Sequence, residues 1–346
     1  MAFWRVETVV RDLAMVSSAR SGVADRRARG GLSNAARVLR PLSVRGALTL
    51  GLVLGWGVLA VPQAQAQTRT RGIDVSSWQG VIDWARVARP ISQGGGGIEF
   101  AFIRATRGGS SGPTSVVDSR FVFNITQARA NGIRVGAYHF ARFDRWTPGD
   151  WTGPNSPRDE AMHFLSVAGP YITEGSLRPV LDIENDSSDP DAASRFTKAE
   201  LTAWALAFAE EITRALGPAA RPIIYVNGWF ANHELNPDIN IYPLWLARYG
   251  STGDPLTTGQ PQPTSSLPNI YGVWNPTGNP SNHPWAFWQY TNTGSVPGIS
   301  GNVDLNVFNN QVYGSIDAFT IATVIPEPAS AAVALSGGVL LLLRRR

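Results

Sequence analysis

Four acidic residues stand at or near the ends of short apolar segments, and two of them are separated by one residue. Asp182 and Glu184 end the segment Pro-Val-Leu-Asp-Ile-Glu, Asp74 lies in Gly-Ile-Asp-Val, and Asp304 lies in Gly-Asn-Val-Asp. Two carboxyls in one partly closed cleft cannot easily both ionise, so the pKa of one should rise. Hydrolysis of a glycosidic bond needs such a pair: an acid protonates the leaving oxygen, and a carboxylate stabilises the positive centre or attacks it.

The spacing of Asp182 and Glu184 suits a β-strand, in which alternate side chains point to the same face. Their Cα atoms would then be about 6.5 Å apart. Leu181 and Ile183 would face the other way, toward covering helices. The alternative is a solvated loop edge, because a perturbed acid pair indicates function only statistically. The similar placement of Asp74 and Asp304 favours the catalytic interpretation.

Alternating strands and helices must position these acids. Short apolar runs bounded by turn residues predict strands at 72–75, 98–104, 133–140, 179–183, 222–226, 244–249 and 285–290. Helical periodicity predicts helices at 81–88, 121–131, 158–167 and 198–216. The helix at 198–216 is the best defined, since a capping box begins at Thr197 and Gly217 follows its apolar stripe.

This alternation predicts parallel strands, and about eight strands in about 250 residues indicate an α/β barrel of the TIM type. The region 250–284 is rich in Gly, Pro, Asn and Ser, and it carries no clear helical pattern. We therefore expect a long loop with a hairpin there, and final strands that lack intervening helices. Functional side chains of such barrels collect at the carboxyl ends of the strands.

Composition and charge exclude several classes of protein. A hydrophobic fraction of 43% with 16% charged residues excludes a disordered or coiled-coil chain. The net charge is +4, but residues 1–66 carry +6, residues 324–346 carry +2, and residues 67–323 carry −4. A basic nucleic-acid-binding domain is therefore disfavoured. The absence of cysteine from the sequence excludes disulfides, thiolate metal sites and cysteine nucleophiles.

The N-terminal part of the sequence has the layout of a secretory signal peptide. Arg40 and Arg45 precede the apolar run 47–60, and small residues at Ala64 and Ala66 follow it. The run is shorter than the roughly 20 residues of a typical membrane-spanning helix. A short transmembrane anchor is the alternative interpretation.

The C-terminal part resembles a PEP-CTERM sorting signal. Pro-Glu-Pro at 326–328 precedes the apolar run 331–343, and three arginines follow. An apolar run followed by arginines is a stop-transfer pattern. In PEP-CTERM signals, a membrane-bound sorting enzyme removes the tail. A plain tail anchor is the alternative. We therefore predict a signal-bearing extension at 1–66, a barrel domain at 67–315, and a linker with a sorting segment at 316–346.

Seven motifs follow one another across residues 71–310. They are RGIDVSSWQG at 71–80, FAFIRAT at 100–106, GAYHF at 136–140, LDIE at 181–184, LWLARY at 244–249, WQY at 288–290 and VPGISGNVDLN at 296–306. In this order they resemble the muramidases of glycoside hydrolase family 25. The resemblance implies a modified barrel, (β/α)5(β)3, and cleavage of the β-1,4 bond between N-acetylmuramic acid and N-acetylglucosamine in peptidoglycan.

The same resemblance implies roles for the four acids, without a metal or a cofactor. By family position Glu184 is the general acid/base. Asp182 is its partner, which orients the 2-acetamido group of the substrate in a retaining, substrate-assisted mechanism. Asp74 and Asp304 line the floor of the cleft and hold the sugar.

Aromatic residues near predicted strand ends would supply the surface on which sugar rings pack. We predict Tyr138, Trp245, Trp288 and Tyr290 as substrate-binding residues. Most of the ten tryptophans in residues 67–323 must nevertheless belong to the core.

One position departs from the family pattern. The family usually has an acidic residue after Ala-Thr on the second strand, where this chain has Arg107. A cation there changes the potential of the cleft and can depress the pKa of a nearby carboxyl. The departure therefore concerns a substrate subsite and not the core acids.

Two other functions stay open: a catalytically weak glycan-binding surface module, and a barrel glycosidase acting on another N-acetylated polymer such as chitin. The four acids favour an enzyme, since a binding module does not need the acid pair. The expected partners are peptidoglycan glycan strands and the export and sorting machinery. We expect no nucleic-acid partner, and only transient membrane contact through the terminal segments. The expected location is the periplasm, the outer surface or the medium.

Overall fold

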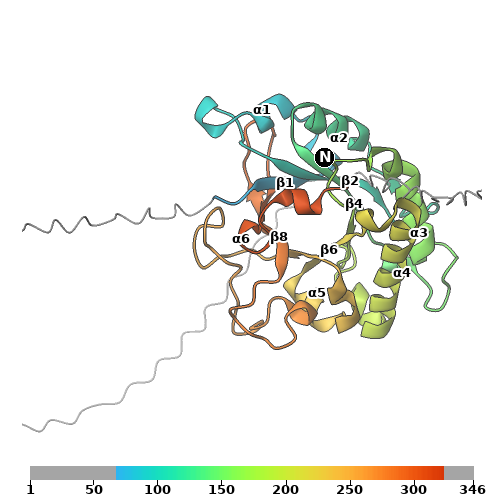
Figure 1. Cartoon of the computed structure of the whole chain (residues 1–346). Coiled ribbons are helices and arrows are strands. Elements are labelled where there is room, and N and C mark those ends of the chain that lie inside the picture. The colour runs from blue at the N-terminus through green and yellow to red at the C-terminus, as the bar shows by residue number, and fades with distance from the viewer. Residues whose placement is uncertain (1–67, 323–346) are drawn as a thin grey trace, which may run out of the picture. The chain divides into compact units, whose positions relative to one another are not determined.

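The computed structural model describes residues 68–322, in which eight strands close into a barrel (Figure 1). The ring runs β1-β2-β4-β5-β6-β7-β8-β9, and β9 pairs back with β1. The strands are β1 (Arg71–Val75), β2 (Phe100–Arg107), β4 (Arg134–Phe140), β5 (Val180–Asp182), β6 (Ile223–Asn227), β7 (Leu244–Ala247), β8 (Trp285–Gly294) and β9 (Val303–Phe308). A short β3 (Val116–Val117) pairs with β2 outside the ring.

Within the described residues, an α-helix follows each of the first five barrel strands, and none lies between β7 and β9. These helices are α1 (Trp84–Ala88), α2 (Phe121–Ala130), α3 (Pro157–Ala168), α4 (Lys198–Leu216) and α5 (Gly228–His233), and a short α6 (Asn310–Tyr313) follows β9. Strands β1 to β8 of the ring pair in parallel, whereas β9 is antiparallel to both neighbours. The predicted modified TIM-type barrel is confirmed, with an antiparallel closing strand.

The helix α4 has the predicted bounds and the predicted N-terminal cap. The Thr197 hydroxyl accepts a hydrogen bond from the backbone N–H of Glu200 at 3.2 Å, and the Glu200 carboxylate accepts one from the backbone N–H of Thr197 at 2.8 Å. Other element ends differ from the predictions by a few residues. The strands β3 and β9 and the short helices α5 and α6 were not predicted.

The segment 250–284 is irregular, as predicted, with one short 3-10 turn at Gly272–Trp274 and two isolated bridges. A buried arginine fastens it to the barrel. The Arg69 guanidinium donates to the carbonyl of Pro255 at 3.0 Å and lies over the ring of Trp285. This loop is therefore held by specific contacts with the barrel wall.

Apolar side chains form two layers, one inside the barrel and one between the strands and the helices. The inner layer includes Phe100, Phe102, Trp245, Phe287 and Phe308. The outer layer joins strand residues such as Leu181 and Ile183 to the buried faces of the helices. The predicted outward direction of Leu181 and Ile183 is therefore confirmed. Residues on the inner face of the strands that do not belong to the inner apolar layer line the mouth of the barrel.

The barrel continues past the predicted boundary at residue 315. Ile316 and Phe319 are buried in the inner apolar layer, and the Phe319 carbonyl accepts from the backbone N–H of Arg178 at 2.9 Å. The boundary was therefore placed too early.

The predicted signal peptide in 1–66 and the PEP-CTERM-like segment after 322 lie outside the described residues. Among residues 68–322, no helix is long and apolar enough to cross a membrane.

Candidate active site

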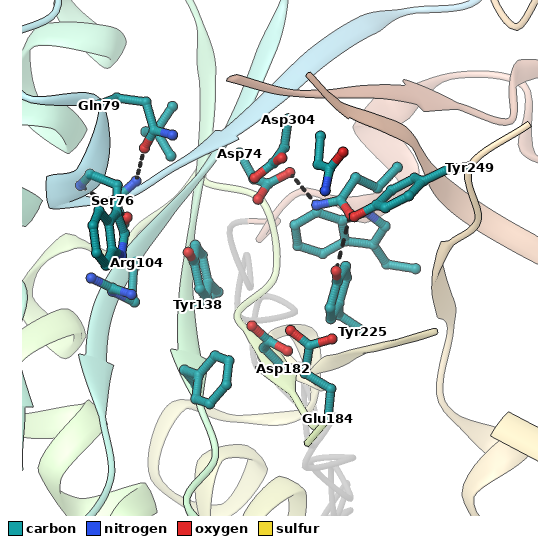
Figure 2. Close-up of a pocket in the computed structure, with 16 residues that line it drawn as sticks. Asp74, Ser76, Gln79, Arg104, Tyr138, Asp182, Glu184, Tyr225, Tyr249 and Asp304 are labelled. Atoms are coloured by element: carbon teal, nitrogen blue, oxygen red, sulfur yellow. Dashed lines mark hydrogen bonds between the residues drawn. The ribbon is translucent and has the colours of Figure 1, made fainter. Parts of the chain in front are cut away.

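A cavity of about 320 Å³ at the mouth of the barrel contains all four predicted acids. Figure 2 shows Asp74 beside Asp304 and Asp182 beside Glu184, with the two pairs directed into the same space. Asp74 comes from β1, and Asp182 and Glu184 come from the end of β5 and the residues after it. The structure thus brings together the four acids that the sequence predicted.

Asp304 reaches this mouth by a different route from the others. It stands near the beginning of β9, not near its end. Because β9 is antiparallel to β1, its first residues lie beside the carboxyl end of β1, and Asp304 is in register with Asp74. The direction of one strand therefore decides whether this acid joins the site.

Asp74 is held by two side-chain amides. Its Oδ1 accepts hydrogen bonds from Gln289 Nε2 at 3.0 Å and from Asn306 Nδ2 at 2.7 Å. The indole of Trp245 donates to Asn306 Oδ1 at 2.8 Å and so orients that amide. Burial raises the pKa of Asp74, and these hydrogen bonds oppose the rise.

The Gln289 amide is oriented in turn by two tyrosines. The hydroxyls of Tyr225 and Tyr249 donate to Gln289 Oε1 at 3.1 Å and 2.9 Å. Because that oxygen is occupied, the amide nitrogen must point toward Asp74. The floor of the cavity is therefore a connected polar network that fixes the position of one carboxylate.

Asp182 and Glu184 differ from Asp74 in how their charge is compensated. Burial, followed by repulsion from Asp74, raises the pKa of Glu184 to about 7. Burial, followed by repulsion from Glu184, raises the pKa of Asp182 well above its ordinary value. Asp182 Oδ1 has no hydrogen-bond partner among the described residues. The pair therefore combines a proton that exchanges near neutral pH with a free acceptor oxygen.

Asp304 is a further acid of the cavity with a raised pKa. Burial, followed by the charge of Asp74, raises the pKa of Asp304 to about 8. Acids this close titrate as a coupled set and not independently. Near neutral pH the site therefore carries fewer negative charges than carboxyl groups.

Two further cavities adjoin the central one and share Glu184 with it. The arginine-side cavity, of about 530 Å³, is lined by Trp78, Arg104, Arg107, Phe140, Glu184, Asn185, Asp186, Ser187 and Ser188. The aromatic-side cavity, of about 370 Å³, is lined by Glu184, Tyr225, Asn227, Gly228, Trp229, Ala247, Arg248, Tyr249 and Leu267. Together the three form a groove across the mouth with Glu184 in every part, which suits an extended polymer better than a small molecule.

The sequence of this domain matches a known family over most of its length. Residues 73–299 match glycosyl hydrolases family 25. Lysozyme M1 of Streptomyces globisporus is 32% identical over 241 residues, which are 69% of this chain and 67% of that protein. The chain belongs to glycosyl hydrolases family 25. It is therefore a glycoside hydrolase.

The chain is also similar to another curated protein and to two solved structures. The uncharacterized protein YegX of Escherichia coli K12 is 31% identical over 241 residues, 70% of each chain. The solved lysozyme of Streptomyces coelicolor is 29% identical with a TM-score of 0.52, and the match covers 73% of this chain and 97% of that one. A family 25 lysozyme from Aspergillus fumigatus, 23% identical, shares the fold with a TM-score of 0.52 over 73% of this chain and 100% of that one.

The predicted sugar-binding aromatics divide between the cavity and the barrel wall. Tyr138 and Trp245 line the central cavity. Trp288 is fully buried in the outer layer, where its indole donates to the Arg248 carbonyl at 2.7 Å, and Tyr290 packs against the same layer. The placement of Trp288 and Tyr290 in the groove was wrong, because Gln289 between them takes the inward position.

Sequence reasoning missed three exposed aromatic residues that line the groove. Trp78, Trp229 and Tyr249 are exposed by 85%, 56% and 48%. Each follows a strand by two or three residues. Tyr249 also continues the inward alternation of Trp245 and Ala247, so the parity of β7 could have identified it.

Proposed function

We propose that this family 25 hydrolase is a muramidase, which cleaves the β-1,4 bond between N-acetylmuramic acid and N-acetylglucosamine in peptidoglycan. One observation carries the proposal: Glu184, with its pKa raised to about 7, opens into every part of the groove beside the unpaired oxygen of Asp182. The lysozymes among its relatives support peptidoglycan as the substrate.

In the first step, protonated Glu184 donates its proton to the glycosidic oxygen as the bond to the anomeric carbon breaks. The carbonyl oxygen of the substrate's own 2-acetamido group attacks that carbon and forms a cyclic oxazolinium ion. Asp182 Oδ1 accepts a hydrogen bond from the acetamido N–H and so orients the carbonyl oxygen for this attack. The leaving sugar departs with the proton of Glu184.

In the second step, the Glu184 carboxylate removes a proton from water as the water oxygen attacks the anomeric carbon. The oxazolinium ring opens, the acetamido group is restored, and Glu184 is again protonated. One water is consumed for each bond cleaved. The two displacements at one carbon retain its configuration.

Asp74 and Asp304 act on this chemistry from the opposite side of the cavity. Burial contributes most to the raised pKa of Glu184, and the charge of Asp74 adds to it and so helps to preserve the proton near neutral pH. Protonated Asp304 relieves the repulsion that a further charge would create. We infer that these two residues also hold sugar hydroxyls at the floor of the groove.

Digestion of purified peptidoglycan tests the proposal. We expect new reducing ends at muramic acid, abolished by Glu184→Gln and retained by Glu160→Gln, whose side chain is buried outside the groove. Release of ends by Glu184→Gln at the wild-type rate would contradict the assigned role. Binding without cleavage supports a glycan-binding module instead, and cleavage of chitin or an exopolysaccharide alone supports a different glycosidase.

We also propose that the protein is exported and carries a PEP-CTERM-like sorting tail. The apolar run 47–60 with its flanking residues, and the Pro-Glu-Pro segment with its apolar and arginine-rich end, support this. Sequencing the N-terminus of protein recovered from the cell envelope and the medium should place it near residue 67. Recovery of the full-length chain from the cytoplasm alone contradicts export.

A further inference from the structure

The arginine-side cavity differs in charge from the rest of the groove. Two arginines, Arg104 and Arg107, and two acids line it, whereas one arginine and four acids line the central cavity. The two cavities share Trp78, Arg104, Phe140 and Glu184. A substituent on a sugar bound beside Glu184 can therefore extend into it.

Each of these arginines pairs with an acid that is less accessible than the arginine itself. The Arg107 side chain is 27% exposed and that of its partner Asp186 is 10% exposed. The Arg104 side chain is 14% exposed, and that of its partner Asp118 is fully buried. The charges of these two pairs balance in number, but each arginine side chain is more exposed than the acid with which it pairs.

The paired acids are also engaged by other donors. Asp118 accepts from the backbone N–H groups of Ser77 and Arg120, each at 2.9 Å. Asp186 accepts from the backbone N–H of Ser188 at 2.9 Å, and the Arg142 guanidinium lies 3.8 Å from its other oxygen. These contacts hold the acids in the wall of the cavity, so their positions do not depend on the arginines alone.

Arg107 keeps most of its hydrogen-bonding capacity. A guanidinium has five N–H donors, and within residues 68–322 the Arg107 side chain donates only to Asp186. Its Cζ also lies 5.5 Å from the centroid of the Phe140 ring, a cation–π contact that favours this position of the guanidinium. An oriented guanidinium with free donors is suited to bind a carboxylate in a forked geometry.

We propose that Arg107 binds a carboxylate carried by the lactyl side chain of N-acetylmuramic acid, and so selects anionic glycans over neutral ones. The inference rests on the proposed muramidase function. The carboxylate is either that of the lactyl group itself or one in the peptide attached to it. Polymers of N-acetylglucosamine alone carry neither, so Arg107 is a specificity residue of this site.

Three substrates test the proposal: peptide-free glycan strands with free lactyl carboxylates, the same strands with carboxylates converted to amides, and strands that retain their peptides. For Arg107→Gln we expect KM on the free-carboxylate strands to rise about tenfold, as the loss of one charge-assisted hydrogen bond implies. We expect kcat to stay within about twofold, because the proton-transfer groups are unchanged. On the amidated strands, KM should match that of the wild type, and Arg107→Lys should restore part of the selectivity.

Arg145→Gln is the matched control, since Arg145 is exposed, pairs with Asp144 and does not line the cavity. An Arg107→Gln effect no larger than that of Arg145→Gln on both the free-carboxylate strands and the peptide-bearing strands overturns the inference. A change confined to peptide-bearing strands supports the inference and assigns the carboxylate to the peptide. Failure of the wild type to cleave any of the three substrates rejects the muramidase function itself. Thermal unfolding of each variant confirms that it is folded.

Discussion

Two glutamic acids with raised pKa values lie on opposite sides of the barrel wall, and they have opposite surroundings. Burial raises the pKa of Glu184 at the mouth, and burial raises the pKa of Glu160, on α3 behind β4, well above its ordinary value. Glu184 opens into the groove, whereas Glu160 is fully buried. Glu160 Oε2 lies 2.7 Å from His139 Nε2 and accepts from the backbone N–H of Arg142 at 3.0 Å.

The network around Glu160 is closed within itself. Burial lowers the pKa of His139 and raises that of Glu160, and both shifts favour the neutral form of each group. The acid then donates to His139 Nε2, and Nδ1–H donates to the hydroxyl of Thr106, 2.8 Å away. The ring of His139 stacks on Phe208 at 5.0 Å, which seals the pair beneath α4.

A buried acid with a raised pKa is therefore not by itself a functional acid. A raised carboxyl pKa reports removal from water in both places. Only the mouth adds an open path for a ligand and an acceptor oxygen, Asp182 Oδ1, without a partner among residues 68–322. In the barrel wall, Glu160 joins α3 to β4 through its hydrogen bonds. At the mouth, the acids remain accessible to a substrate.

The largest effect is expected from Glu184→Gln at the mouth. It should lower kcat/KM on peptidoglycan about a thousandfold, because no general acid remains. In the wild type, the free energy of unfolding should fall between pH 4.5 and pH 7 as Glu184 ionises. In the variant this fall should be smaller by about 2 kcal/mol. The sign follows from a folded-state pKa of about 7, above the unfolded value: stability is fullest below pH 4.5 and falls as pH rises. Hydrolysis assays and denaturant unfolding at both pH values measure the two effects, and an activity loss accompanied by destabilisation at pH 7 would argue for a structural role.

In the barrel wall, Glu160→Ala should lower stability and leave activity almost unchanged. We expect the free energy of unfolding to fall by about 3 kcal/mol, because His139 and the Arg142 N–H lose a buried partner and a cavity remains. The kcat/KM of the folded enzyme should change less than threefold. Glu160→Gln is the control, since a neutral amide can replace a neutral acid at smaller cost. If Glu160→Gln destabilises as much as Glu160→Ala, the buried pair is ionic.

The dependence of activity on pH should reflect the acids at the mouth of the barrel and not Glu160. We expect kcat/KM to fall above about pH 7, approaching tenfold per pH unit, as Glu184 loses its proton. Asp74→Asn should move this fall to lower pH, because the charge of Asp74 raises the pKa of Glu184. Glu160→Gln should leave the fall where it is. Measuring kcat/KM from pH 4 to pH 9 for the three proteins checks this, and a shift caused by Glu160→Gln would show that the two regions are coupled.

The smallest effect concerns two tryptophans. Trp78→Ala should raise KM about fivefold with little change in the free energy of unfolding, because an exposed ring of the groove loses its contact with sugar. Trp288→Phe should leave KM unchanged and cost about 1 kcal/mol of stability, because the hydrogen bond to the Arg248 carbonyl is lost. Kinetics and thermal unfolding of both variants decide the matter. A rise in KM for Trp288→Phe alone would reverse the assignment of the two rings.

Local patterns in the sequence determined much of this protein. The capping box and apolar stripe of α4 specify a helix without help from distant residues, and its bounds were predicted. The alternation at 181–184 correctly directed Leu181 and Ile183 outward and Asp182 into the cavity, because the side-chain period of a strand is two. The order of such local patterns also predicted an α/β barrel of the TIM type, and the resemblance of the motifs to family 25 added its modified form, (β/α)5(β)3.

The tertiary structure decided what depends on contacts between distant segments. The antiparallel direction of β9 brings Asp304 into register with Asp74, and a register shift between β7 and β8 precedes the inward Gln289 and the outward Trp288. The Glu160–His139 pair forms only when α3 packs on β4. Strand direction, register and packing are set by the summed burial and hydrogen bonding of the whole barrel. The sequence therefore identified the acids, and the fold determined which other groups surround them.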